Sequence, residues 1–364
     1  MRIGDVRGHD RIRSILSRAL ERDRLPPALL FAGPDGVGKK TLALAVAQAA
    51  LCERAPAPEA CGECRPCRAV AAALQPGRLE ELRGEADRHP DEDVWRNFRL
   101  HPDLVLAEGW WLTRTGRPRS EPEIRVDQVR DLIGEIAGAP FEARRRVFVI
   151  DDAHTMNEAA QNALLKSLEE PPPRSHVLLV SGAPLGLRQT IRSRCQLLRF
   201  GPLTRVAVAS FLAERGGVPA EEAALRAALA GGSPGAALVF ESEAYARMRE
   251  SLLALLERAE GLDAMGRMQA AEELEQAEDP AQLLTTLRSL LRDVAASRAG
   301  AGAGALMNAD VAARLGALGS GPLGERAPRL AERAGEARRA LRGFASKLLT
   351  FDLLVDALAG DEPV

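Results

Sequence analysis

The sequence predicts a parallel α/β domain over residues 1–203, followed by helices as far as residue 364. Two observations lead to this fold class. Short apolar runs alternate with helical patterns up to residue 200, which is the order expected of a parallel sheet covered by helices on both faces. Beyond residue 203 the strand signals fade and helical patterns follow one another. The length fits two or three domains rather than one.

Four apolar runs in the first part are the predicted strands. They are ALLFAG (28–33), RVFVID (146–151), HVLLVSG (176–182) and QLLRF (196–200). Apolar residues at helical spacing predict helices over 41–52, 126–138, 157–170 and 187–194. Asn157 is the expected N-cap of the third helix, and Pro171 ends it.

The bulk composition limits the function classes. The net charge is −2 and only 4% of the residues are aromatic, which speaks against a chain that binds nucleic acid on its own. The N-terminus has no apolar signal-peptide region, and no run of about 18 apolar residues occurs. We therefore expect a soluble, cytoplasmic protein with no membrane partner.

A glycine-rich stretch, GPDGVGKKTLA from Gly33 to Ala43, follows the first predicted strand. The phosphate-binding pattern is G-x-x-x-x-G-K-[ST], in which the last hydroxyl binds magnesium. Gly33, Gly38 and Lys39 fit this pattern, but Lys40 stands where the hydroxyl belongs, and Thr41 comes one residue late. The chain has only four lysines, and two of them lie here. The stretch predicts a nucleotide site that lacks the magnesium-binding hydroxyl.

The strand VFVI ends in two carboxylates, Asp151 and Asp152. In nucleotide hydrolases the first acid of such a pair holds magnesium, and a following Glu polarises the attacking water. Asp151 fits the first role. Asp152 is one methylene shorter than Glu, and a base that does not reach its water is a poor base. The alternative is that both acids only end a strand at the surface.

Four of the five cysteines form the pattern C-x8-C-x2-C-x2-C, at Cys52, Cys61, Cys64 and Cys67. Disulfides are not expected without an export signal. A C-x2-C turn presents two thiolates to one tetrahedral zinc ion, and four thiolates leave no position for water. The cluster predicts a structural zinc site that folds a segment with little core of its own. Reduced, unpaired thiols are the alternative.

Residues 77–100 are densely charged. We expect a solvated surface insertion with some helix there, and a partner site is the alternative.

Several stretches together resemble bacterial clamp-loader subunits of the AAA+ class. They are GPDGVGKKTLA, the cysteine cluster, IRVDQVRDLI, VFVIDDAHTMNEAAQNALLKSLEEPP and SRC, and they cover about residues 1–245 in order. The resemblance implies a RecA-like α/β domain over 1–203, with a zinc module at about 52–67 and the charged insertion at about 77–100. It further implies a helical lid over 204–245 and a helical clamp-loader collar domain over 246–364.

In this family two subunit types carry the cysteine cluster: the ATP-hydrolysing motor (gamma/tau) and the stator (delta-prime), whose nucleotide site is often degraded. The length of the chain and its altered loop favour the stator type of DNA polymerase III. The resemblance then implies a hetero-oligomeric ring with gamma/tau and delta subunits, which loads the sliding clamp on primed DNA. The chain would belong to a DNA-directed DNA polymerase holoenzyme without polymerase activity of its own.

The resemblance also assigns roles to single residues. Arg194 of the SRC motif would be an arginine finger that acts in trans on a neighbour's ATP, where a rigid, permanently charged fork stabilises phosphoryl charge. Ser181 would stand at the sensor-1 position. Gly235 and Ala236 stand where motor subunits carry a sensor-2 arginine. The degenerate nucleotide site would comprise Gly33, Gly36, Gly38, Lys39, Lys40, Thr41, Asp151, Asp152 and Ser181.

Three departures, at Lys40, Asp152 and Gly235, together argue against ATP turnover. The loop glycines and Lys39 remain, so backbone amides can still cradle phosphate. We expect ATP binding to be weak or absent, and Lys40 to be a candidate substitute for the magnesium charge. Two alternatives stay open: an active motor subunit that uses Thr41 after a shift of the loop, and a zinc-dependent protein that binds nucleic acid on its own.

Overall fold

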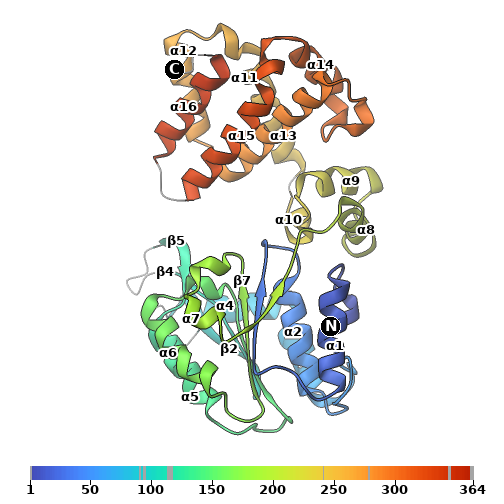
Figure 1. The fold of residues 1–364 in the computed structure, drawn as a ribbon, viewed down its shortest axis with the longest axis vertical. Coiled ribbons are helices and arrows are strands. Elements are labelled where there is room, and N and C mark those ends of the chain that lie inside the picture. The colour runs from blue at the N-terminus through green and yellow to red at the C-terminus, as the bar shows by residue number, and fades with distance from the viewer. Residues whose placement is uncertain are drawn as a thin grey trace. The chain divides into compact units, whose positions relative to one another are not determined.

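The computed structural model describes residues 2–89, 92, 96–112, 118–240, 242–277, 279–342 and 346–360. The chain divides into two compact units (Figure 1). The first consists of Met1–Phe211 and Gly232–Gly235, and the second of Leu212–Gly231 and Ala236–Val364. Each unit has a hydrophobic core of its own.

A six-stranded sheet in the order β2-β3-β6-β7-β1-β8 forms the centre of the first unit. All neighbouring strands are parallel except β2, which pairs antiparallel with β3 at one edge. A separate two-stranded sheet pairs β4 with β5. The strand bounds are β1 Ala28–Ala32, β2 Asn97–His101, β3 Leu104–Ala107, β4 Trp110–Leu112, β5 Pro118–Glu123, β6 Arg146–Ile150, β7 Ser175–Ser181 and β8 Gln196–Arg199.

Helices cover both faces of the sheet, as the alternating sequence pattern predicts (Figure 1). The cores on the two faces include residues of α1 (Asp10–Glu21) and α2 (Lys39–Leu51) on one side, and of α5 (Val126–Ile136) and α6 (Glu158–Glu169) on the other. Successive strand residues serve opposite faces, because side chains alternate along a strand. In β1, Phe31 belongs to the first core and Leu30 to the second.

The four predicted strands correspond to β1, β6, β7 and β8. Sequence inspection missed β2 and β3. Residues 97–100, expected within a charged surface insertion, instead belong to the sheet as part of β2, where Phe98 and Leu100 are buried. The insertion does contain helix, α4 (Pro76–Asp87), which follows α3 (Arg65–Ala73). Residues 90, 91 and 93–95 of this segment lie outside the described residues.

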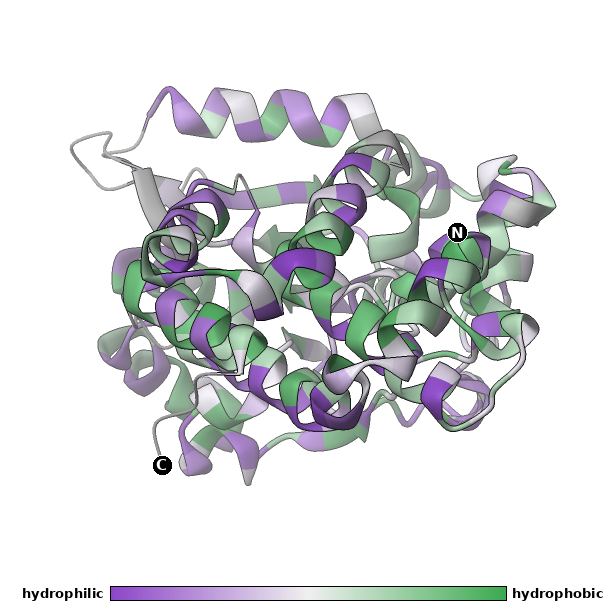
Figure 2. Ribbon diagram, turned by 90° about the horizontal axis from the view of Figure 1, so that it is seen from above, coloured by the Kyte–Doolittle hydropathy of each residue, from purple (hydrophilic) through white to green (hydrophobic). Residues whose placement is uncertain are grey.

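Beyond the sheet the described chain is helical, as predicted. The helices are α8 Arg205–Gly216, α9 Ala220–Leu229, α10 Pro234–Leu238, α11 Ser242–Arg258, α12 Ala264–Glu275, α13 Pro280–Arg298, α14 Ala312–Ser320, α15 Pro322–Arg342 and α16 Lys347–Ala359. Helix α13 is central to the second unit and packs against α11, α14 and α15. Most helices carry both hydrophobic and hydrophilic residues (Figure 2). The structure divides into two compact units and does not separate residues 204–245 from residues 246–364. The division of this helical part into a lid and a collar therefore stays a prediction.

None of the helices in the described part of the chain is long and apolar enough to cross a membrane.

Candidate functional site

The predicted nucleotide-site residues gather at the carboxyl ends of three inner strands of the large sheet. The glycine loop follows β1, Asp151 and Asp152 follow β6, and Ser181 is the last residue of β7. These three parallel strands are neighbours in the order β6-β7-β1. Their carboxyl ends therefore meet on the same side, which is where ligands bind in open α/β sheets.

The glycine loop, residues 33–38, binds the Lys39 ammonium with its own oxygen atoms and packs tightly against the end of β8. A Cβ atom at Gly33 would lie 2.3 Å from the carbonyl oxygen of Phe200, so a residue with a side chain does not fit there. The buried Lys39 ammonium donates to the carbonyl oxygens of Gly33 and Pro34, both at 2.6 Å, and to Asp35 Oδ1 at 3.2 Å. All three donors of this ammonium are thereby engaged within the loop.

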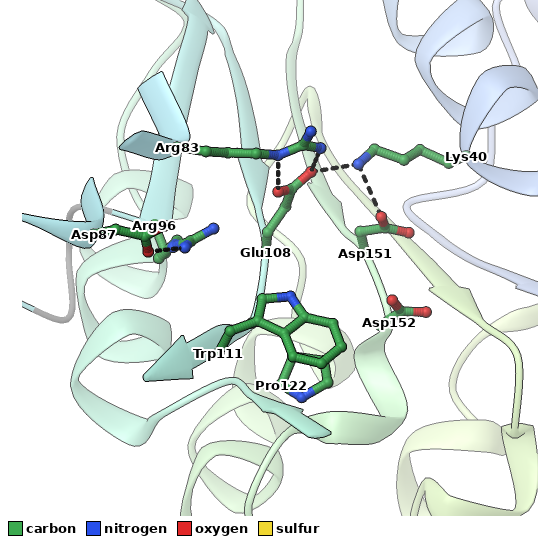
Figure 3. A pocket seen from close by; sticks show the side chains of 10 residues that line it. Lys40, Arg83, Asp87, Arg96, Glu108, Trp111, Pro122, Asp151 and Asp152 are labelled. Atoms are coloured by element: carbon green, nitrogen blue, oxygen red, sulfur yellow. Dashed lines mark hydrogen bonds and ion pairs between the residues drawn. The ribbon is translucent and has the colours of Figure 1, made fainter. Parts of the chain in front are cut away.

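Lys40 points away from the loop into a network of charges (Figure 3). Its Nζ atom lies 2.9 Å from Asp151 Oδ2 and also donates to Glu108 Oε1. The Arg83 guanidinium binds the same Glu108 carboxylate through Nε at 2.9 Å and Nη2 at 2.8 Å. Lys40 lies in α2 and Arg83 in α4, while Glu108 and Asp151 directly follow β3 and β6. These four residues, here called the Lys40 network, line a pocket of about 320 Å³.

Burial and neighbouring charges shift the pKa values in and beside this network. Burial alone would raise the pKa of Glu108, but Arg83 and Lys40 outweigh it and lower the pKa to about 2. Burial likewise opposes the charge of Lys40, yet Asp151 and Glu108 hold its pKa above the usual value. The pKa of Asp152 is raised by burial and then by the Asp151 charge. Glu108, Lys40 and Arg83 are thus charged at neutral pH.

Three further residues of the predicted nucleotide site, Thr41, Asp152 and Ser181, differ in how far they are exposed to solvent. Thr41 is exposed on the first turn of α2. Asp152 has a left-handed backbone with φ 44° and lines the pocket beside Asp151. The Ser181 hydroxyl is fully buried and has no hydrogen-bond partner among the described residues. Such a group is available for an incoming polar atom.

Gly235 makes a direct backbone contact with the glycine loop. Its N–H donates to the carbonyl oxygen of Gly36 at 2.9 Å. A Cβ atom at position 235 would lie 2.9 Å from Gly36 Cα. The position that the resemblance assigns to a sensor-2 arginine is thus filled by main chain, and an arginine would not fit there without moving the loop.

The four clustered cysteines converge as predicted for a metal site. Their sulfur atoms all lie within 4.8 Å of one another. Two of the distances, Cys61–Cys67 and Cys52–Cys64, are 4.0 Å and 3.9 Å. Four Zn–S bonds of about 2.3 Å in a tetrahedron place the sulfurs about 3.8 Å apart. The cluster therefore fits a zinc ion.

The backbone beside Cys61 favours a thiolate there, whereas burial raises the pKa values of Cys52 and Cys67. The N–H groups of Glu63 and Cys64 both point at Cys61 Sγ, at 3.4 Å. The hydrogen bonds from Cys64 and Glu63 lower the pKa of Cys61 to about 6. Cys52 caps the C-terminus of α2, so the cluster lies one 13-residue helix, about 20 Å, from the glycine loop.

Arg194 lies apart from the pocket residues, on the short corner between α7 (Gln189–Arg192) and β8. The buried residues Ile191 and Cys195 anchor this corner on either side. The guanidinium is about a third exposed. It donates to the carbonyl oxygen of Thr190 at 2.9 Å and pairs with Glu169 Oε1 at 2.5 Å.

Sequence inspection missed Glu108 and Arg83. The apolar run 104–107 ends in Glu108, just as the run before Asp151 ends in an acid. That signal was available, because both acids follow parallel strands. Arg83 gave no signal, since it is one arginine in a charged helix.

Comparison with known proteins relates the chain to one protein family. A family model described as DNA polymerase III, delta subunit, matches residues 8–204. The DNA polymerase III subunit delta' of Pseudomonas aeruginosa is 37% identical over 209 residues, which is 57% of this chain and 53% of that protein. The subunit tau of Bacillus subtilis is 30% identical over 207 residues, 57% of this chain and 30% of that protein. The matched region thus spans about half of the first relative and less than a third of the second.

A solved structure of a gamma subunit-related protein from Thermotoga maritima also aligns with the chain. It is 14% identical, with a TM-score of 0.36 over 96% of this chain and 99% of that one. The family match, by contrast, extends over more than half of the sequence and includes the glycine loop, the cysteines and the SRC corner. On this ground, the chain belongs to the DNA polymerase III delta subunit family of clamp-loader proteins.

Proposed function

We propose that this chain is the stator, or delta-prime, subunit of the DNA polymerase III clamp loader. In this role it joins gamma/tau and delta subunits in a ring that loads the sliding clamp on primed DNA. Its own nucleotide site does not turn over ATP. It supplies Arg194 to the ATP of a neighbouring motor subunit. The family match and the relatives named delta' and tau support this assignment.

The observation that carries the proposal is the closure of the chain's own phosphate loop. The three donors of Lys39 bind acceptors of the loop itself, and Gly235 lies against Gly36. A phosphate would have to displace these contacts before the loop amides and Lys39 could bind it. Asp152 is too short for the role of a glutamate base, so water activation is also missing. We expect weak or absent ATP binding and no useful hydrolysis.

Arg194 has the properties required of a group that acts on another subunit. Its backbone is fixed between two buried anchors, while its guanidinium is partly exposed. The ion pair with Glu169 orients the side chain in the free chain. An exposed pair of this kind contributes only about 0–1 kcal/mol, so the guanidinium can exchange Glu169 for a phosphate oxygen at little cost. A planar fork then stabilises the charge that develops during phosphoryl transfer.

Reconstitution with gamma/tau and delta subunits tests the role of Arg194. We expect Arg194→Ala to assemble normally but to lose DNA-stimulated ATPase at the adjoining site, together with much of the clamp loading. Arg188→Ala is the matched control, because Arg188 lies at the other end of α7, is similarly exposed and also pairs with a surface glutamate, Glu158. Equal rates for the two variants would remove Arg194 from this role.

The isolated chain tests the alternatives. A fluorescent ATP analogue measures nucleotide binding, and phosphate release measures turnover. Rapid hydrolysis by the purified chain would identify it as a motor subunit. A shift of labelled DNA by the chain alone would instead favour autonomous nucleic-acid binding.

A further inference from the structure

The residues beside the glycine loop do not fit the magnesium ion that an active phosphate-binding loop carries. Such a site needs a hydroxyl after the loop lysine and a carboxylate at the next strand end, with both oxygens free for the metal. Here position 40 has no hydroxyl. The carboxylate in question, Asp151, instead accepts the Lys40 ammonium at 2.9 Å.

The ammonium and a metal ion compete for the same carboxylate. Magnesium binds oxygen at about 2.1 Å. An ion on Asp151 Oδ2 would therefore lie within about 5 Å of the Lys40 nitrogen, which is 2.9 Å from that oxygen. Two like charges at this distance repel each other, and the repulsion grows where solvent is partly excluded. Lys40, Asp151 and Glu108 are 27%, 17% and 11% exposed, so the solvent screens this repulsion only in part.

The Lys40 side chain is also held in place from a second direction. Figure 3 shows it extended between Asp151 and Glu108, with Arg83 on the far side of Glu108. The two cations and two anions of the network balance each other. A metal ion would have to disrupt both the Asp151 pair and this charge balance.

We propose that Lys40 is a built-in cation that takes the place of the divalent metal at this nucleotide site. The site therefore excludes magnesium and manganese. This inference deepens the proposed inactivity of the site, since it names the residue that keeps the metal out. It concerns cation binding in the free chain, so it stands or falls independently of Arg194.

Manganese binding to the purified chain of 364 residues, prepared with zinc present, tests the proposal. The loss of the free Mn²⁺ signal in electron paramagnetic resonance reports bound metal without any need for nucleotide. We expect no specific Mn²⁺ site in the wild type. Lys40→Ser, which restores a hydroxyl and removes the charge, should bind about one Mn²⁺ at least tenfold more tightly than the wild type.

Two further variants give this experiment its controls. Lys40→Arg keeps the charge and should exclude Mn²⁺ as the wild type does. Adding Asp151→Asn to Lys40→Ser should abolish the new site, which separates it from weak binding by surface acids. Thermal unfolding shows that each variant is folded.

Two outcomes would overturn the proposal. One is a specific Mn²⁺ site in the wild type that Asp151→Asn removes. The other is a folded Lys40→Ser chain that binds Mn²⁺ no better than the wild type. Since the Arg194 assay measures ring ATPase, neither outcome would by itself decide whether the chain is a stator.

Discussion

Glu108 shows how a single buried carboxylate can stabilise the fold around the glycine loop and the strand ends beside it. Its side chain is 11% exposed, and an isolated charge at such a position would be costly. Two hydrogen bonds from Arg83 and one from Lys40 offset this cost. Together they connect α2 and α4 with the ends of β3 and β6.

The lowered pKa of Glu108 predicts a dependence of stability on pH. A carboxylate whose folded pKa lies near 2, below its unfolded value of 4.5, stabilises the fold above about pH 4.5. This contribution disappears as the pH falls towards 2. We expect Glu108→Gln to destabilise the first unit by about 2–4 kcal/mol at pH 7 and by much less near pH 2.5, as measured by urea unfolding.

Glu81→Gln is the control for this measurement. Glu81 lies in α4 and pairs with Arg78 at the surface, so its loss should change the stability by less than about 0.5 kcal/mol. A constant difference between Glu108→Gln and the wild type from pH 7 to pH 2.5 would contradict the assigned pKa.

At the scale of elements, α2 joins the two features that the sequence marked most clearly. The glycine loop precedes its first residue, and Cys52 caps its last turn. Gln48 on the same helix donates to the carbonyl oxygen of Cys67 at 2.7 Å, so the cysteine segment also contacts α2 along its side. The helix thus gives the segment 52–67 a fixed support, although that segment contributes few core residues of its own.

Removal of the metal should therefore unfold the cysteine segment rather than the sheet. Native mass spectrometry should find one zinc ion per chain in the wild type. We expect Cys64→Ser or a strong chelator to remove it and to make residues 53–66 sensitive to limited proteolysis, while the remaining domain stays folded. Cys195→Ala is the control, because Cys195 lies outside the cluster and its loss should leave the zinc content unchanged. A metal-free chain with a protected segment would contradict this prediction.

The sequence predicted most of the elements whose signals are local, although the apolar run of β3 was overlooked. Continuous apolar runs marked β1, β6, β7 and β8, and cysteine spacing marked the cluster. Strand β2 escaped because its buried Phe98 and Leu100 alternate with polar residues inside a charged stretch. The nucleotide-site residues were predicted from their motifs, but the Lys40 network was not. It depends on Glu108 and Arg83, which come next to Lys40 only through the order of strands in the sheet.

At the scale of the whole molecule, the two units are stabilised by different means. The first depends on a sheet with a core on each face. The second has a helical core that contains a buried polar cluster. Asp293 in α13 accepts the N–H groups of Met307 and Asn308, at 3.1 Å and 2.8 Å. The Asn308 side chain in turn accepts the Tyr245 hydroxyl at 2.6 Å.

Separate cores predict separate unfolding transitions. We expect Asp293→Ala to leave the buried Asn308 N–H and the half-buried Met307 N–H without their acceptor and to destabilise the second unit by about 2–4 kcal/mol. Differential scanning calorimetry should show one transition moving to lower temperature while the other stays in place. Glu108→Gln should move the opposite transition. If both variants shifted a single common transition, the two units would unfold as one cooperative body.

The burial of α2 restricts how this protein can transmit movement. Eleven of its thirteen residues are buried, so the helix is held in place by packing along its whole length. A rearrangement at residues 33–38 cannot tilt α2 without disrupting the packing of its buried side chains. A change of shape at the loop would therefore leave the cysteine end of α2 in place.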